Sequence, residues 1–121
     1  GAGLLTSIGQ PLNIDKYRLE LEANGYRFVD TVYEHGEYAI RGSILDIYPM
    51  GSELPIRIEL FDDEVETLRT FDTETQRSLD KIDRINLLPA NEFPWDKSSR
   101  LAFRTSKTMY IPAIINGRTK L

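Results

Sequence analysis

The chain has 121 residues, of which 40% are hydrophobic and 28% charged, a size and composition typical of one folded domain. It has no cysteine, which excludes disulfides, thiolate nucleophiles and cysteine-based zinc sites, and its single histidine excludes any mechanism that needs two. The net charge of −4 argues against autonomous DNA or RNA binding, because domains with that function usually carry an excess of Lys and Arg.

The first residues indicate a piece of a longer protein. Gly1, Ala2 and Gly3 are typical of an expression scar, and we expect residues 1–12 to be this scar and an entry linker. The domain proper is expected over residues 13–93, followed by an exit helix and tail over residues 94–121. No apolar run approaches the roughly 20 residues of a membrane span and no signal-peptide pattern is present, so we expect a cytoplasmic chain without membrane contact.

Residues 13–24 carry the signals of an amphipathic helix. Asn13 is a suitable N-cap, apolar residues recur at helical spacing, and Gly25 supplies a left-handed stop. Residues 26–33 have the β-branched and aromatic content of a strand, and the polar residues 34–37 are typical of a tight turn. The pattern therefore predicts a hairpin with a second strand over residues 38–41.

Further strands are predicted in close succession. Residues 43–48 are apolar on both faces except at Asp46, as expected of a central strand. Residues 56–61 alternate, with Ile56, Ile58 and Leu60 on the face that must be buried and Arg57, Glu59 and Phe61 on the other. After an acidic turn, residues 65–71 are predicted to form the next strand, with Val65, Thr67 and Arg69 on one face. Residues 84–88 are predicted to form a last short strand.

These elements define the fold class. The connections are too short for helical crossovers, and helical patterns occur only near the two ends, over residues 13–24 and 96–105. We therefore predict an α+β domain with a mainly antiparallel meander sheet and flanking helices.

Support for catalysis is weak. Asp46, Asp62, Asp63 and Glu64 carry the oxygen ligands that Mg²⁺ or Ca²⁺ prefer, but acidic turns are normally solvated and no EF-hand spacing is present. His35 lies in a predicted turn without a nucleophile motif, and no phosphate-binding loop, dinucleotide fingerprint or HExxH motif occurs. We predict no catalytic residue, metal, cofactor or small-molecule substrate, and keep a metal-dependent phosphodiester enzyme as a distant alternative.

The face opposite the core is more informative. Phe61 on that face projects toward solvent or an absent partner, unless it caps the core or packs under a terminal helix. Arg41 ends the strand over residues 38–41 and shares this side of the sheet, unless it is simply a solvated arginine. Together with Arg57 they form an aromatic anchor flanked by guanidinium groups, a composition enriched in protein interfaces.

Several runs of residues carry a family resemblance. They are Gly36 to Pro49 (GEYAIRGSILDIYP), Arg57 to Val65 (RIELFDDEV), Phe71-Asp72, Thr75 to Ser78, Leu87 to Ala90 and Glu92 to Pro94. From Asn13 to about Arg104 the chain resembles the UvrB-homologous UvrA-interaction domain of bacterial transcription-repair coupling factors (Mfd), a fold similar to domain 2 of UvrB. UvrB sequences tend to carry a second basic residue where this chain has Ala39, which favours the coupling factor.

The resemblance implies a function. It implies a non-catalytic module that docks on UvrA and brings it to stalled RNA polymerase for nucleotide excision repair. The parent protein is then an ATP-dependent DNA translocase that reaches polymerase and DNA through other domains. It further implies that a distant C-terminal domain masks the docking surface in the intact protein.

The resemblance also implies a set of contact residues. UvrA contacts map onto Arg41, Arg57 and Phe61, and Glu59 is expected either to hold Arg57 in position or to meet a basic residue of UvrA. Charge reversal of Arg57 is then expected to abolish UvrA binding without unfolding the domain. The equivalent domain of UvrB and a purely structural spacer are the alternatives, and the isolated piece is a candidate for homodimer formation.

Overall fold

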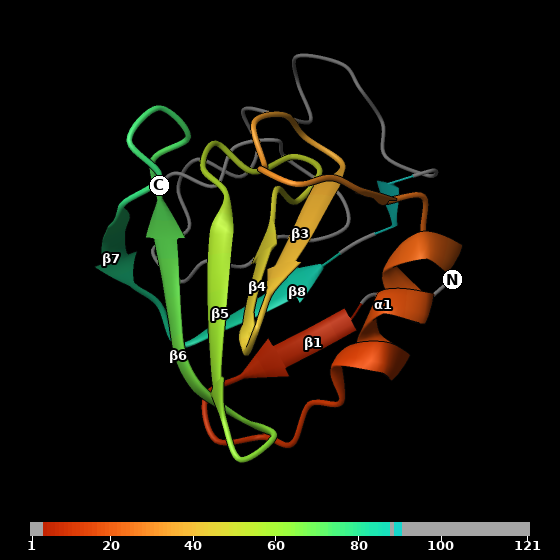
Figure 1. Cartoon of the computed structure of the whole chain (residues 1–121), viewed down its shortest axis with the longest axis vertical. Coiled ribbons are helices and arrows are strands. Elements are labelled where there is room, and N and C mark those ends of the chain that lie inside the picture. Colours follow the sequence, from red (N-terminus) through yellow and green to blue (C-terminus); the bar gives the residue numbers. More distant parts are fainter. Residues whose placement is uncertain (1–3, 88, 91–121) are drawn as a thin grey trace.

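A six-stranded and a two-stranded β-sheet pack against each other in the computed structural model, with one helix beside them among the residues that it describes, 4–87 and 89–90 (Figure 1). The elements are β1 (Leu4–Ser7), α1 (Ile14–Ala23), β2 (Arg27–Phe28), β3 (Glu37–Arg41), β4 (Ile44–Ile47), β5 (Ile56–Phe61), β6 (Glu64–Phe71), β7 (Ser78–Lys81) and β8 (Arg84–Leu87). The large sheet has the order β2-β3-β4-β5-β6-β7, and the small sheet pairs β1 with β8. No helix in the described ranges has the length and apolar character needed to cross a membrane.

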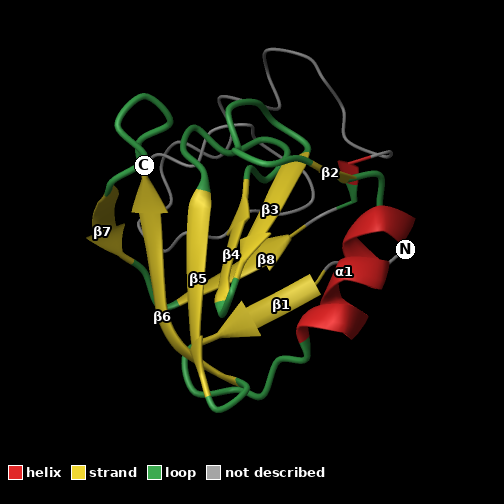
Figure 2. Ribbon diagram, viewed as in Figure 1, coloured by secondary structure: helices red, strands yellow, loops and turns green. Residues whose placement is uncertain are grey.

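The main core lies between the two sheets and the helix. Ile58 of β5 and Leu68 of β6 face Ile85 of β8 and Leu21 of α1, and all four side chains are almost fully buried. Figure 2 shows α1 beside β1 at the side of the molecule away from β7. The alternation predicted for residues 56–61 is confirmed, since Ile56, Ile58 and Leu60 are all buried in this core.

The predicted first helix is confirmed together with its caps. The Asn13 side chain accepts a hydrogen bond from the backbone N–H of Lys16 at 3.0 Å, as an N-cap residue does. Gly25 follows the helix with φ of +91°, a left-handed conformation that glycine adopts without a steric penalty. The second predicted helix, over residues 96–105, and the tail lie outside the described residues.

The first strand lies within residues 1–12, where only a scar and an entry linker were expected. Residues 4–7 form β1, which pairs antiparallel with β8 from Leu4 opposite Leu87 to Ser7 opposite Arg84. Because its partner lies at the other end of the described chain, no local hairpin signal marks β1 as a strand.

The predicted hairpin over residues 26–41 is wrong. The second predicted strand, over residues 38–41, is confirmed as part of β3, but within residues 26–33 only Arg27–Phe28 forms a strand. This strand runs parallel to β3, so the large sheet is mixed although most of its strands are antiparallel. The chain between β2 and β3 is a loop in which Val32 is fully buried against the outer face of the sheet. The apolar, β-branched composition of this segment therefore reflects packing of a loop on the sheet, and not strand formation.

The rest of the large sheet is the predicted antiparallel meander, with two differences. β7 lies in a segment for which no strand was predicted. A register shift in the β5–β6 pair places an extra residue in β6, so that Val65 and Leu68 both face the core. Val65 is thus on the opposite side from Thr67 and Arg69, which strict alternation does not predict.

A buried hydroxyl pair joins β1 to α1. Thr6 Oγ1 lies 2.8 Å from the hydroxyl oxygen of Tyr17, and both side chains are buried. Burial raises the pKa of Tyr17 to about 12, because the charged phenolate is poorly solvated inside the protein, while the hydrogen bond with Thr6 acts weakly in the opposite direction. The neutral phenol is therefore favoured by folding.

This shift predicts a loss of stability in alkaline solution. Tyr17 stays protonated in the folded chain while the unfolded chain releases the proton above about pH 10, so the free energy of unfolding falls as the pH rises from about 10 to 12. We expect Tyr17 to account for about 1.4 kcal/mol of that fall by pH 11. Urea unfolding at pH 9 and 11 of the natural chain and of Tyr17→Phe measures this part as a difference. Equal pH dependence in the two chains would contradict the prediction.

Candidate functional site

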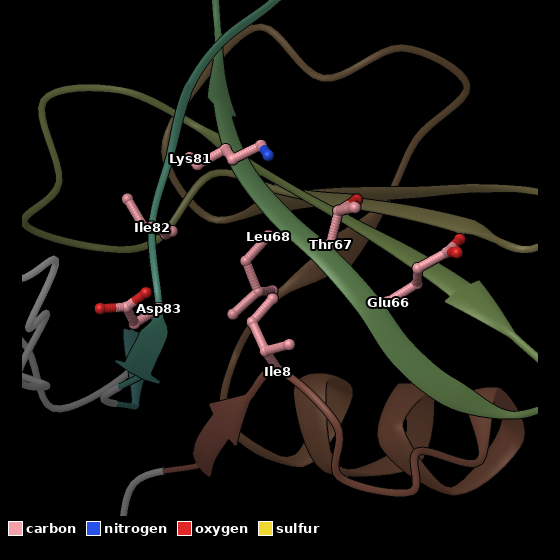
Figure 3. A pocket seen from close by; sticks show the side chains of 7 residues that line it. All are labelled: Ile8, Glu66, Thr67, Leu68, Lys81, Ile82 and Asp83. Carbon is pink, nitrogen blue, oxygen red and sulfur yellow. The ribbon is translucent and has the colours of Figure 1, made fainter.

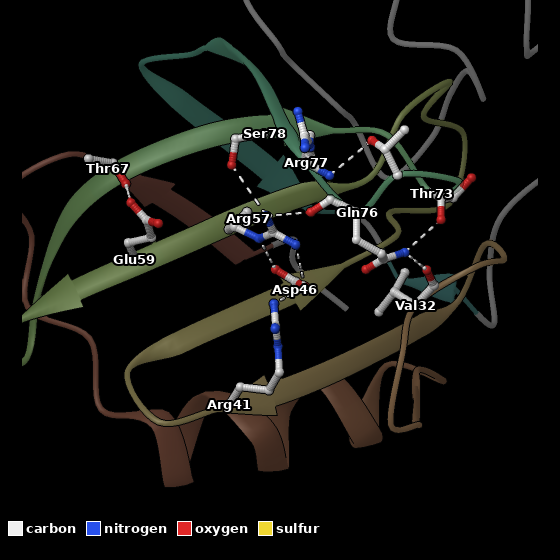
Figure 4. A network of polar contacts seen from close by, with 11 residues as sticks. Val32, Arg41, Asp46, Arg57, Glu59, Thr67, Thr73, Gln76, Arg77 and Ser78 are labelled. Atoms are coloured by element: carbon white, nitrogen blue, oxygen red, sulfur yellow. Dashed lines mark hydrogen bonds and ion pairs between the residues drawn. The ribbon is translucent and has the colours of Figure 1, made fainter.

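A buried ion pair lies at the centre of the outer face of the large sheet. Asp46 of β4 stands opposite Arg57 of β5, and their side chains are only 3% and 8% exposed. Arg57 Nε lies 2.8 Å from Asp46 Oδ1 and Arg57 Nη2 lies 3.1 Å from Oδ2, which is the bidentate geometry of a guanidinium on a carboxylate (Figure 4). The guanidinium carbon is also 4.3 Å from the centre of the Phe71 ring. Arg57 is therefore held on two sides.

The same arginine fastens two loops to the sheet. Arg57 Nη1 donates to the backbone oxygen of Gln76 at 3.0 Å and to Ser78 Oγ at 3.3 Å. Gln76 has a left-handed φ of +64°, and its side-chain amide donates to the backbone oxygens of Val32 and Thr73 at 3.2 and 2.7 Å. Figure 4 shows these contacts meeting around Arg57 from several elements. The ion pair thus orders the loops before β3 and β7.

Arg41 and Phe61 are exposed on this face, at one end of the sheet. β3 and β5 both run antiparallel to β4, so Arg41 at the end of β3 and Phe61 at the end of β5 lie at the same end of the sheet. Phe61 is 65% exposed and the Arg41 side chain 57%, while Arg41 Nη2 approaches Asp46 Oδ2 at 3.4 Å. Phe61 therefore does not cap the core among the described residues.

Glu59 does not hold Arg57 in position, which was one of its two expected roles. It stands opposite Thr67 of β6 and accepts a hydrogen bond from the Thr67 hydroxyl, while Asp46 binds Arg57. The residue that positions Arg57 is therefore Asp46, which was considered from the sequence only as a candidate metal ligand. A single carboxylate inside an otherwise apolar strand was the available signal, because a buried charge requires a partner of opposite charge.

The acidic residues do not gather into a metal site. Within the described residues no group of three or more His, Asp or Glu side chains is arranged to hold a metal ion. Asp46 is occupied by Arg57, and Asp62 and Asp63 form the two-residue β5–β6 turn with left-handed φ values of +52° and +62°. Aspartate tolerates this conformation and is common in such turns.

A pocket of about 240 Å³ lies elsewhere, at the junction of β6 with the β7–β8 connection (Figure 3). Apolar, polar and charged side chains of both signs line it: Ile8, Glu66, Thr67, Leu68, Lys81, Ile82 and Asp83. None of the four predicted contact residues belongs to it.

Comparison with known proteins defines the class to which this fold and face belong. Residues 4–93 match the model of the UvrB interaction domain. The chain therefore belongs to the UvrB interaction domain family, and the matched family is a protein interaction module.

The relatives identify the branch of the family. The chain is 58% identical over 101 residues to the transcription-repair-coupling factor of Haemophilus influenzae and 53% identical over 105 residues to that of Escherichia coli, covering 84% and 87% of this chain. The Bacillus subtilis transcription-repair-coupling factor is 44% identical over 89 residues, which are 74% of this chain. The chain is thus the UvrB interaction domain of a transcription-repair coupling factor, and it spans 9% of the length of the first two relatives.

The buried ion pair changes the expected effect of reversing Arg57. Arg57→Glu places a second carboxylate beside Asp46 and removes the donors that hold Gln76, and breaking a buried pair costs about 3–5 kcal/mol. We expect urea unfolding to show this decrease in the free energy of unfolding. Arg41→Glu is the control, since Arg41 is exposed, and it is expected to cost less than about 1 kcal/mol. A stable Arg57→Glu chain would show that the pair contributes little to the fold.

Proposed function

We propose that the chain is the docking module with which a transcription-repair coupling factor binds UvrA and brings it to stalled RNA polymerase for nucleotide excision repair. In this role the chain works in the cytoplasm, and polymerase and DNA are contacted by other parts of the parent protein. The proposed UvrA contacts are Arg41, Phe61 and Glu59, with Arg57 as a fourth residue that acts mainly by holding the surface in shape.

The observation that carries the proposal is the exposure of Phe61. A phenylalanine that is 65% exposed at the end of a central strand leaves a large apolar ring in water. At the same end of the sheet, but separated from it by β4, lies the exposed side chain of Arg41. Exposed aromatic and arginine side chains on one face of a sheet are the residue types that dominate protein interfaces.

The equivalent domain of UvrB is the alternative within the same family. The relatives named above are coupling factors, and Ala39 favours them too. Ala39 is 3% exposed and packs with Val32 and Phe71, directly opposite Asp46. A long basic side chain at this position would have to displace that packing, so the two kinds of domain differ beside the ion pair.

Removing the ring of Phe61 tests the proposal. In a calorimetric titration with UvrA we expect Phe61→Ala to weaken binding by about 2–4 kcal/mol, a factor of roughly 30 to 1,000 in Kd. Its thermal unfolding should stay close to that of the natural chain, because the ring is exposed.

Leu19→Ala is the matched control. Leu19 of α1 is 67% exposed, so its truncation removes solvent-exposed apolar surface as Phe61→Ala does. This surface belongs to the helix and not to the sheet. Unchanged binding is expected for this variant. If the natural chain fails to bind UvrA at all, the docking role is wrong and a structural spacer is favoured. If Phe61→Ala binds as tightly as the natural chain, the position of the contact surface is wrong.

A further inference from the structure

A row of charged residues crosses four strands on the outer face of the large sheet. Strand register places Asp46 of β4 opposite Arg57 of β5, Arg57 opposite Arg69 of β6, and Arg69 opposite Lys81 of β7. Residues directly opposite in a sheet point to the same side. One carboxylate therefore shares a single line with three cations, and Arg41 adds a fourth cation beside Asp46.

The two halves of this row differ in how their charge is balanced. In the first half, Arg57 binds both oxygens of Asp46. In the second half, neither Arg69 nor Lys81 forms an ion pair with any residue of the described ranges, and Arg69 Nε is shielded from solvent without a hydrogen-bond partner. The nearest carboxylate along β5, Glu59, accepts from the Thr67 hydroxyl instead. Like charges directly opposite each other destabilise a sheet, so this half of the row works against the fold.

The position of these cations points to an external carboxylate. Arg69 is partly exposed and Lys81 exposed, and Figure 3 shows the Lys81 side chain extending toward β6. We infer that Arg69 and Lys81 form a binding site for an acidic side chain of the protein that docks on this face, a second contact region that rests on the proposed UvrA-binding function.

The charge of the whole chain favours a protein carboxylate over a nucleic-acid phosphate. With a net charge of −4 the chain lacks the basic excess that draws a domain to DNA or RNA. The exposed ring of Phe61 on the same face, in contrast, is typical of a protein contact. A partner that seats an apolar pocket over Phe61 and an acidic residue between Arg69 and Lys81 satisfies both features.

Charge-neutralising variants of the 121-residue chain test this site in titrations with UvrA. We expect Arg69→Gln and Lys81→Gln each to weaken UvrA binding roughly tenfold or more, and the double variant to lose less than the product of the two, because both side chains serve one carboxylate. Arg84→Gln removes the same charge from an exposed site on β8 in the other sheet, and its UvrA affinity is expected to be unchanged. Arg69→Gln should melt at the same or a higher temperature than the natural chain, because it relieves repulsion between strands.

The outcomes separate this site from the proposed function. If the natural chain binds UvrA, Phe61→Ala loses that binding and Arg69→Gln does not, the carboxylate site is wrong while the docking function stands. If the natural chain does not bind UvrA, both the docking function and the carboxylate site are wrong. A parallel titration with a short DNA duplex tests whether the two cations bind phosphate instead. If Arg69→Gln removes duplex binding and leaves the UvrA affinity unchanged, the assignment to an acidic protein partner is wrong.

Discussion

The ion pair between Asp46 and Arg57 is the constraint on which the outer half of this domain depends. Two charged side chains stand in the middle of the large sheet, almost completely removed from water, where an unpaired charge would be strongly unfavourable. Each charge is tolerated because the other is present in bidentate geometry. The remaining donors of Arg57 then reach the backbone of Gln76, so one electrostatic requirement also fixes the loops around the sheet.

The outer face is divided into a covered end and an open end by this arrangement. At the covered end Val32 packs over Phe71, whose ring also lies under the Arg57 guanidinium. At the open end Phe61 and Arg41 have no such cover among the described residues. Phe61 and Phe71 stand near opposite ends of the paired strands β5 and β6, so two aromatic residues of one face serve different purposes. The buried one supports the sheet, and the exposed one is available for binding.

The sequence predicts elements whose signals are local and fails where partners are distant. The helix over residues 13–24 and the strand over residues 56–61 follow from spacing and caps, and the structure confirms both. The strand β1 pairs with residues at the far end of the described chain, and the parallel pairing of β2 requires a loop that packs on the sheet. The expected site residues share one face of the sheet, as predicted from strand alternation. The pairing of β4 with β5, which the sequence does not reveal, is what shows that Arg57 is buried and bound to Asp46.

The charge row illustrates the same limit at the level of function. Asp46, Arg57, Arg69 and Lys81 are too far apart in sequence for any local window to group them, and the chain as a whole is acidic. Strand pairing alone brings them onto one line and concentrates positive charge on one face. Since the Arg69 half of that line receives no balancing carboxylate from the described residues, its cations weaken the sheet that carries them. Functional sites often keep residues that lower the stability of the fold, because binding requires them. The unbalanced cations of this row fit that pattern.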